Sequence, residues 1–321
     1  MKTVQDTWPL ALPSGGLLVL ALGALLASAP GALLAPHHLR AQVTYDRILR
    51  SADEPQNWLT YNGTYSSQRH SGLDQITAAN VGDLESKWVL QNQVFGAWQS
   101  NPIVVDGIMY ITQRPNDVMA VDPVTGRVFW RFRHTPDENA RVCCGANNRG
   151  VAVLGDKLFM GTLDARLIAL DAINGRPIWD IEVADVNLAY SVTMAPLVVK
   201  DKVIIGNGGT EWSASRGFVT AYDAQTGDQA WRFYVVPGNP ADGFEDNAMK
   251  MAAETWTGNW WEHGGGGNVW HGITYDPEFN QIYIGTGNGS PWNQKIRSPD
   301  GGDNLFLCAV VALDADTGKY R

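Results

Sequence analysis

One pattern recurs four times along the chain: an Asp, a Gly four residues later, and a Trp four residues beyond that Gly. The Asp of each copy is residue 122, 171, 223 or 314, so neighbouring copies are 49, 52 and 91 residues apart. The Trp of the fourth copy would be residue 322, one position past the last residue given. Repeats of about 50 residues with four short strands each are typical of β-propeller blades. An antiparallel sandwich also has closely spaced strands, but it does not repeat three residues in nearly fixed register.

Each copy follows two alternating apolar runs that predict a pair of strands. In the first three copies the turn between these runs falls at Asp106–Gly107, Gly155–Asp156 and Lys200–Asp201. The Asp and Gly of the pattern then predict a tight turn into a fourth strand that ends in the Trp. The sequence therefore predicts an all-β fold, a β-propeller of four-stranded antiparallel blades in which each Trp packs between neighbouring blades.

We expect residues 42–321 to form the N-terminal part of this propeller, about four to five blades that leave the ring incomplete and open. A degenerate earlier copy of the pattern ends at Trp88 and indicates an incoming first blade. The tryptophans of the pattern are predicted to be structural, not functional: Trp88, Trp130, Trp179 and Trp231.

Composition limits the choice of partners. The chain has 24 Lys and Arg against 33 Asp and Glu, a formal charge of -9, which argues against a nucleic-acid partner because phosphate binding needs a basic surface. The 13 Trp, 34 Gly and only 18% charged residues fit a turn-rich β protein.

The N-terminal region predicts export. Residues 15–35 are an uncharged apolar run, and Ala41 offers a small residue for cleavage. This favours a signal peptide over residues 1–41 and a periplasmic location. The alternative is a retained anchor that associates the protein with the inner membrane, because the run is about as long as a bilayer-spanning helix requires. Export would place the cysteines where disulfides persist.

The adjacent Cys143 and Cys144 interrupt the repeat in the segment RVCCGANNRG. A disulfide between neighbours has to span Cα atoms only about 3.8 Å apart, so it is strained and flat and suits a wall against a planar ligand. The alternatives are that one of the pair bonds Cys308 or that both are free thiols. We favour the bridge between neighbours and place Cys308 in an apolar strand, LFLCAVVAL.

Two further interruptions are candidate functional segments. In GNGGTEWSASRG, two glycines precede the carboxylate of Glu211, and bare backbone beside one acid is what a close anion or metal contact needs. An insertion from Pro237 to Trp292 accounts for the 91-residue spacing and holds TWTGNWWEHGGGGNVWHG and GTGNGSPWN. Its glycines and tryptophans predict either a floor for a planar ring or a Gly-rich turn packed with aromatic side chains.

Together these segments resemble the pyrroloquinoline quinone (PQQ) dependent alcohol dehydrogenases, the methanol and ethanol dehydrogenase family, whose full-length propeller has eight blades. TWTGNWWEHGGGGNVW, YIGTGNGSPWN and RSPDGGDNLFL look most like the quinohaemoprotein alcohol dehydrogenases. The resemblance runs from about Trp58 to Arg321. It implies a set of PQQ contacts: Gln99, Cys143, Cys144, Arg149, Thr193, Gly208, Gly209, Thr210 and Trp270.

The resemblance also implies a role for each of these groups. The Cys143–Cys144 disulfide would cover one face of PQQ, and Trp270 would stack on the other. Arg149 would lie near the quinone oxygens, where a fixed cation stabilises the charge of the reduced ring. Thr193 and residues 208–210 would contact the cofactor carboxylates.

Glu211 and Asn288 match two protein ligands of a divalent metal. Hard oxygen donors fit Ca²⁺, with a lanthanide as the alternative. The metal would act as a Lewis acid on the quinone carbonyl. The implied reaction is periplasmic oxidation of a small primary alcohol to an aldehyde by hydride transfer to PQQ, with electrons passed to a cytochrome c.

The chain departs from the family pattern at three positions. Gln99 stands where a Glu is usual, Asn268 where a Thr is usual, and His271 where an Asp is frequent. The family's catalytic base, an Asp, would lie beyond Arg321, so we assign no catalytic residue within this chain and expect the fragment alone to be inactive. The alternative function is a non-catalytic propeller scaffold of the outer-membrane assembly type. A sugar-oxidising quinoprotein is a third reading, but it would normally lack the adjacent Cys pair.

Overall fold

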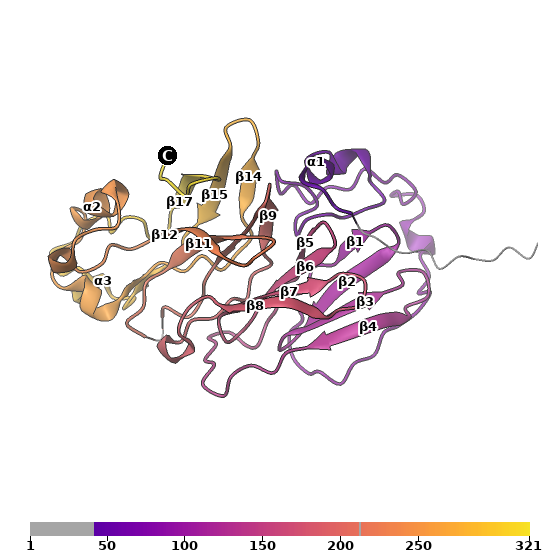
Figure 1. The fold of residues 1–321 in the computed structure, drawn as a ribbon, viewed down its shortest axis with the longest axis horizontal. Coiled ribbons are helices and arrows are strands. Elements are labelled where there is room, and N and C mark those ends of the chain that lie inside the picture. The colour runs from indigo at the N-terminus through magenta and orange to yellow at the C-terminus, as the bar shows by residue number, and fades with distance from the viewer. Residues whose placement is uncertain (1–41, 212) are drawn as a thin grey trace, which may run out of the picture. The chain divides into compact units, whose positions relative to one another are not determined.

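The computed structural model describes residues 42–211 and 213–321, which contain three complete four-stranded antiparallel sheets and a fourth sheet of three strands (Figure 1). The predicted signal peptide, residues 1–41, lies outside the described residues. The first sheet consists of β1 (Ile103–Val105), β2 (Ile108–Gln113), β3 (Asp117–Val121) and β4 (Val128–Arg133). The second consists of β5 (Ala152–Leu154), β6 (Lys157–Gly161), β7 (Arg166–Asp171) and β8 (Pro177–Glu182). The third consists of β9 (Leu197–Val199), β10 (Lys202–Gly206), β11 (Phe218–Asp223) and β12 (Gln229–Tyr234). The fourth consists of β14 (Thr274–Asp276), β15 (Gln281–Gly285) and β17 (Val310–Asp314), and an isolated bridge joins Leu313 to Tyr320.

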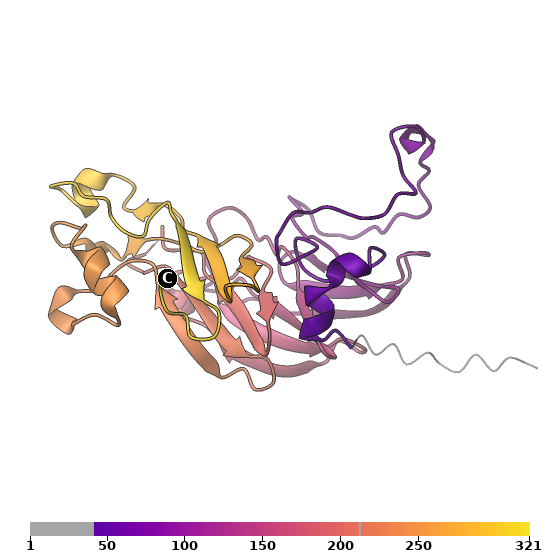
Figure 2. The same cartoon turned by 90° about the horizontal axis from the view of Figure 1, so that it is seen from above.

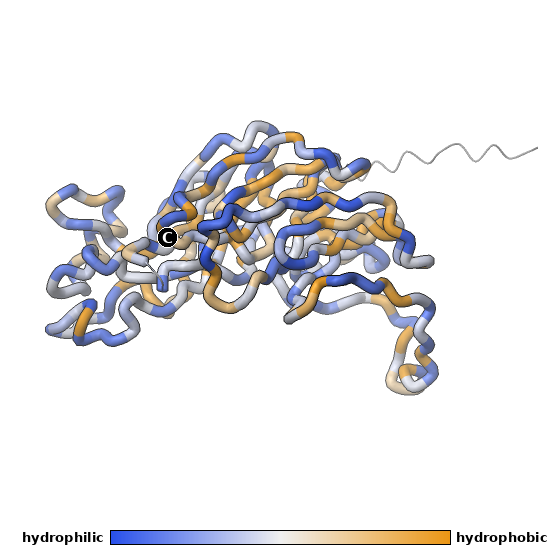
Figure 3. Tube along the Cα trace, turned by 90° about the horizontal axis from the view of Figure 1, so that it is seen from below, coloured by the Kyte–Doolittle hydropathy of each residue, from blue (hydrophilic) through white to orange (hydrophobic). Residues whose placement is uncertain are grey.

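The sheets stand side by side in chain order as the blades of an open, partial propeller (Figure 2). The third strands of the first three blades, β3, β7 and β11, are largely buried on both faces. Figure 3 shows hydrophobic stretches alternating with hydrophilic ones along the chain. In the first hairpin Asp106 and Gly107 both have positive φ, 49° and 80°, as a two-residue turn that matches strand twist requires. The predicted turns at Asp106–Gly107, Gly155–Asp156 and Lys200–Asp201 all join the first two strands of a blade.

The repeated pattern locks one blade to the next. Each Asp accepts hydrogen bonds from backbone amides of its own turn, as Asp171 does from Ile173 and Asn174 at 2.8 and 3.0 Å. The Gly that closes the turn, Gly175, lies against the indole of Trp130 in the preceding blade, and a Cβ there would be 2.4 Å from that ring. The indole Nε1 of Trp130 donates to the Ala172 carbonyl at 3.2 Å, so a single turn supplies both a packing surface and an acceptor.

The other copies repeat these contacts. Trp88 packs on Gly126 and donates to Pro123, and Trp231 packs on Gly318 and donates to Ala315. Trp179 packs on Gly227 less closely, and its buried Nε1 has no acceptor among the described residues.

Two expectations about these strands were incomplete. The fourth strands do not end at the Trp: β4, β8 and β12 run on to Arg133, Glu182 and Tyr234. This is because their pairing with the third strand continues past the Ala residue opposite each Trp. The segment ending at Trp88 forms no strand in the structure, although its indole takes the docking position.

The expected insertion from Pro237 to Trp292 is wrong as a single segment. Strands β14 and β15 of the fourth blade lie inside it and divide two insertions, residues 237–273 and 286–309. The first holds α2 (Asn247–Ala253) and short 3-10 turns at Pro240–Asp242 and Trp260–His263; the second holds α3 (Gln294–Arg297). The two insertions pair through β13 (Gly265–Gly266) and β16 (Gly289–Ser290). The four glycines from 264 to 267 all have positive φ, and a Cβ on Gly266 would be 2.6 Å from the Asn288 carbonyl.

The segment before the first blade contacts the first, third and fourth sheets. It contains α1 (Tyr45–Leu49) and 3-10 turns at Ser51–Asp53 and, farther on, Val81–Asp83. Trp58 pairs with Val104 of β1, and the Tyr65 hydroxyl donates to the Val198 carbonyl of β9 at 2.7 Å. The Tyr45 and Tyr275 hydroxyls are 2.9 Å apart, which reaches the fourth blade. None of the helices in the described part of the chain has the length and apolar character needed to cross a bilayer.

Gly175→Ala is expected to destabilise the fold by about 3 kcal/mol, because left-handed backbone costs 1–2 kcal/mol in a non-Gly residue and overpacking against Trp130 adds 1–3 kcal/mol. Gly107→Ala is the matched control: Gly107 also has positive φ, but no atom lies within 4 Å of the added Cβ. Urea unfolding followed by tryptophan fluorescence measures both. Equal losses of unfolding free energy in the two variants would show that contact with the Trp130 indole contributes nothing beyond the backbone conformation of the turn.

Candidate functional site

A cavity of about 680 Å³ lies at one edge of the sheets, where the first strand of each blade begins and its second strand ends. In an antiparallel sheet those two positions share an edge, so the loops before β1, β5, β9 and β14 and after β10 and β15 converge there. The lining residues come from all six loops: Gln99, Val142, Cys143, Cys144, Gly145, Asn147, Arg149, Ser191, Thr193, Gly208, Gly209, Glu211, Asn268, Trp270, His271, Asn288 and Trp292.

Ten of the eleven residues that the sequence singled out as contacts therefore line one cavity. Thr210 does not. Its side chain is fully buried, and its hydroxyl donates to Oδ1 of Asn268 at 2.8 Å. Sequence reasoning missed Asn147 and Ser191, which also line the cavity. The only signal for Asn147 was its position shortly after the Cys pair, and the only signal for Ser191 was its position two residues before Thr193.

A disulfide between Cys143 and Cys144 forms one wall of the cavity. Cys308 is a free, exposed thiol, so neither alternative pairing occurs. Its expected place in a strand is wrong: residues 305–308 form a turn, and β17 begins only at Val310. The Asn147 amide donates to the Cys144 carbonyl at 2.9 Å and braces this wall, while Oδ1 of the same buried side chain has no partner among the described residues.

The loop that carries the disulfide is anchored at its start by a buried carboxylate. Both oxygens of Asp164 lie within 3.0 Å of His134 Nε2, and one accepts from the Asp137 amide at 3.1 Å. Burial opposes ionisation of Asp164, but hydrogen bonds from His134, Thr162 and the Asp137 amide hold its pKa at about 2. The carboxylate is therefore charged at any pH near neutrality.

Arg149 and Trp270 line the same cavity and lie next to each other. Arg149 donates to the hydroxyl and carbonyl oxygens of Thr193 at 2.7 and 3.2 Å, and its Cζ lies 5.0 Å from the centroid of the Trp270 ring. The indole is 43% exposed, although most of its neighbours in the segment are buried. Burial lowers the pKa of Arg149. Burial also lowers the pKa of His271, and Arg149 and Arg69 lower it further, so His271 is neutral at neutral pH.

Gly208 and Gly209 present bare backbone to the cavity. Gly208 exchanges two backbone hydrogen bonds with Ser191, at 3.1 and 2.8 Å. Gly209 has φ of +102°, and a Cβ there would be 1.8 Å from the Ala189 carbonyl. No side chain fits at Gly209, because the Ala189 backbone occupies the position that a Cβ would take.

Glu211 and Asn288 line this same cavity from the loops after β10 and β15. The part of the chain that the structure describes contains no cluster of three or more His, Cys, Asp or Glu able to hold a metal ion. A cation bound here would have one carboxylate and one amide oxygen from these two residues and would take its remaining oxygen ligands from elsewhere.

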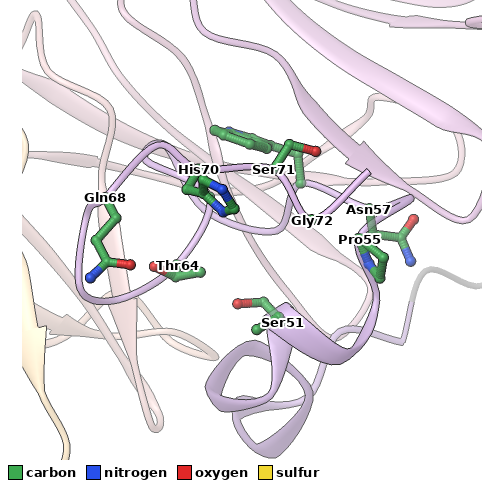
Figure 4. A pocket seen from close by; sticks show the side chains of 11 residues that line it. Ser51, Pro55, Asn57, Thr64, Gln68, His70, Ser71 and Gly72 are labelled. Carbon is green, nitrogen blue, oxygen red and sulfur yellow. The ribbon is translucent and has the colours of Figure 1, made fainter. Parts of the chain in front are cut away.

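A second pocket, of about 140 Å³, lies within residues 51–72 (Figure 4). Ser51, Asn57, Thr64, Gln68 and His70 line it, and none of the residues singled out from the sequence does. It is too small for a tricyclic ligand and contains no carboxylate or arginine, so we place the functional site in the larger cavity.

Asp164→Asn is expected to lower the free energy of unfolding by about 2 kcal/mol at pH 6–7. Because the folded pKa of Asp164 is depressed, its stabilisation is present above the unfolded pKa of about 3.9 and is lost as the pH falls toward 2. The gap between wild type and variant should therefore close between about pH 4 and pH 2. Denaturant unfolding at several pH values measures this difference in unfolding free energy. Asp156→Asn, at an exposed carboxylate, is the control. A gap independent of pH would refute the role of the carboxylate charge.

Comparison with known proteins gives a consistent result. The sequence profile of the PQQ glucose/ethanol/alcohol dehydrogenase β-propeller domain matches residues 58–321. Quinohemoprotein alcohol dehydrogenase ADH IIB of Pseudomonas putida is 48% identical over 287 residues, which cover 88% of this chain and 41% of that protein. The quinohemoprotein alcohol dehydrogenase of Comamonas testosteroni is 46% identical over 285 residues, covering 87% and 40%.

Solved structures agree. That of quinohemoprotein alcohol dehydrogenase ADHIIG from Pseudomonas putida HK5 has a TM-score of 0.85 at 47% identity, covering 88% of this chain and 42% of that one. A europium-containing methanol dehydrogenase has a TM-score of 0.77 at 34% identity, covering 86% and 50%. The chain thus spans about two fifths of the length of the first relatives. It belongs to the PQQ β-propeller family of glucose, ethanol and other alcohol dehydrogenases.

Proposed function

We propose that this chain is part of an exported PQQ- and metal-dependent dehydrogenase that oxidises small primary alcohols to aldehydes and passes the electrons to a cytochrome c. The observation that carries the proposal is the convergence of residues from Gln99 to Asn288 on one cavity. These residues lie outside the repeated pattern, so blade packing does not explain their types or their meeting.

The residues present fit PQQ, a planar tricyclic quinone with carboxylates. A volume of about 680 Å³ is within the range of sites that enclose small ligands. The disulfide and the Trp270 indole supply two flat surfaces, and Arg149 supplies a cation held in place by Thr193. The unpartnered Oδ1 of Asn147 offers a polar contact that no described protein group uses.

Bound PQQ would supply an acceptor for the hydride of the alcohol carbon, and the hydroxyl proton would pass to a base. Arg149 would orient the quinone and stabilise the negative charge of the reduced ring, because it is fixed and partly desolvated. Cys143–Cys144 and Trp270 would exclude water from both ring faces. Gln99 and Thr193 would bind polar groups of the cofactor. Among the lining residues described, Glu211 is the only carboxylate, and we assign it to the metal; the base is expected beyond Arg321.

Glu211 and Asn288 would hold Ca²⁺, and a lanthanide is the alternative ion, given the europium-containing methanol dehydrogenase among the relatives. The named relatives support the substrate class and the electron acceptor: several are alcohol dehydrogenases, and one is a methanol dehydrogenase [cytochrome c] subunit. We further propose that residues 1–41 are a signal peptide that directs the protein to the periplasm, with a retained inner-membrane anchor as the alternative.

A propeller scaffold without a cofactor is the competing function. It requires the repeated pattern but gives no reason for a disulfide, an exposed indole, an arginine and a carboxylate on one cavity. The two functions differ in one measurable property, which is alcohol-dependent reduction of a dye in the presence of PQQ and a metal.

Glu211→Ala in the whole protein is expected to lower alcohol-dependent dye reduction by about 100-fold or more, because the metal loses a charged ligand and with it several kcal/mol of Lewis-acid stabilisation. The circular dichroism spectrum should not change, since Glu211 is outside the blade-packing pattern. Glu278→Ala is the matched control: Glu278 is an exposed acid in the turn between β14 and β15, at the other edge of the sheet. Wild-type activity in Glu211→Ala would favour the scaffold.

A further inference from the structure

The two proposed metal ligands are carried by loops that are far apart in sequence and joined by a third segment. Glu211 follows β10, and Asn288 follows β15. Between them in space lies the segment Gly267–Asn268, which forms hydrogen bonds to the residues next to both ligands.

The Asn268 side chain holds the first loop. Oδ1 of Asn268 accepts from the amide and the hydroxyl of Thr210, at 3.1 and 2.8 Å, and Thr210 is the residue immediately before Glu211. The same oxygen accepts from the side-chain nitrogen Nδ2 of Asn207 at 3.5 Å. Asn268 is 3% exposed and Thr210 is fully buried, so these bonds are shielded from water.

The main chain of the same segment holds the second loop. The Gly287 amide donates to the Asn268 carbonyl at 2.8 Å, and Gly287 is the residue immediately before Asn288. The Gly267 amide donates to the carbonyl of Asn288 itself at 3.0 Å. A Cβ on Gly287 would lie 3.2 Å from the Asn268 carbonyl oxygen, so the two strands of chain approach closely at this point.

We propose that Asn268 is a positioning residue that fixes the separation of Glu211 and Asn288, and through it the metal affinity and ion-size selectivity of the site. This rests on the function proposed above. Groups that orient metal ligands without touching the metal commonly change affinity by 10- to 100-fold when removed. Because Trp270 is two residues along the same segment, Asn268 also connects the metal ligands to the indole.

The test compares metal binding by wild type and five variants of the purified whole protein, stripped of metal and saturated with PQQ. Titration with Ca²⁺ is followed by calorimetry, and titration with Tb³⁺ by sensitised luminescence. Asn268→Ala is expected to lower the affinity for both ions by about 10- to 100-fold. Asn268→Asp keeps an acceptor oxygen and should recover most of that affinity. Thr210→Val removes one of the three donors and should cause a smaller loss, about threefold.

Asn304→Ala is the matched control. Asn304 is an equally buried amide in the second insertion, and it bonds Thr255, Ser298 and Arg297, none of which adjoins a proposed ligand along the chain. Its metal affinity should stay within about twofold of wild type, although its stability falls. If Asn268→Ala does not fold, the comparison of Thr210→Val with Asn304→Ala decides the matter.

Ion size provides a second measurement. Wild type should discriminate between La³⁺ and Lu³⁺, which have the same charge and different radii, and Asn268→Ala should lose most of this discrimination. Unchanged affinity and selectivity in Asn268→Ala, with binding lost in Glu211→Ala, would overturn this inference alone. A wild-type protein that binds neither ion would overturn the proposed metal site as well. If Asn268→Ala loses affinity for PQQ in the presence of EDTA, the positioning role of Asn268 is also overturned, because Asn268 would then be a direct cofactor contact.

Discussion

The contact of a tryptophan with the glycine of the next blade's turn is the interaction on which the rest of the structure depends. A propeller blade is a small sheet that cannot bury both faces alone, so it requires neighbours in a fixed orientation. The Asp side chain shapes the turn, the Gly leaves room for the indole, and in three of the four contacts the carbonyl after the Asp accepts the indole N–H. Each residue of the repeated pattern thus has a separate physical role.

Because the blades are locked in register, their loops meet at one edge. The loops that contribute to the cavity are longer than a hairpin turn requires, and they contain residues that packing does not explain. Glycines allow them to approach closely: Gly206 and Gly217 would each collide with the main chain of residues 267–269 if they carried a Cβ. The core therefore supplies rigidity, and glycine-rich loops supply the contact between elements that places polar side chains together.

The electrostatics of the cavity follow from which charges are paired. Asp164 is buried with His134, behind the disulfide loop, and stabilises the loop without entering the cavity. Arg149 is bound by the neutral oxygens of Thr193 and stacks near Trp270, so its charge is not cancelled by a carboxylate contact. Glu211 supplies the single negative side chain of the described lining. A cavity with a fixed cation, a flat wall and one acid suits an anionic planar ligand together with a metal ion.

The sequence by itself determined the all-β fold and the blade register, because Trp, Gly and Asp at fixed spacing have few structural explanations. The ten cavity residues were identified in another way, through the resemblance of their segments to the PQQ-dependent alcohol dehydrogenases. It could not show that Cys308 lies in a turn, or that Thr210 faces Asn268 and not the cavity. Both outcomes depend on contacts between separate loops: Thr210 with Asn268, 58 positions apart, and Cys308 with Gly287, 21 positions apart. Only the tertiary structure decided them, since hydrogen-bond partners across loops are chosen by three-dimensional proximity and leave no local pattern in the chain.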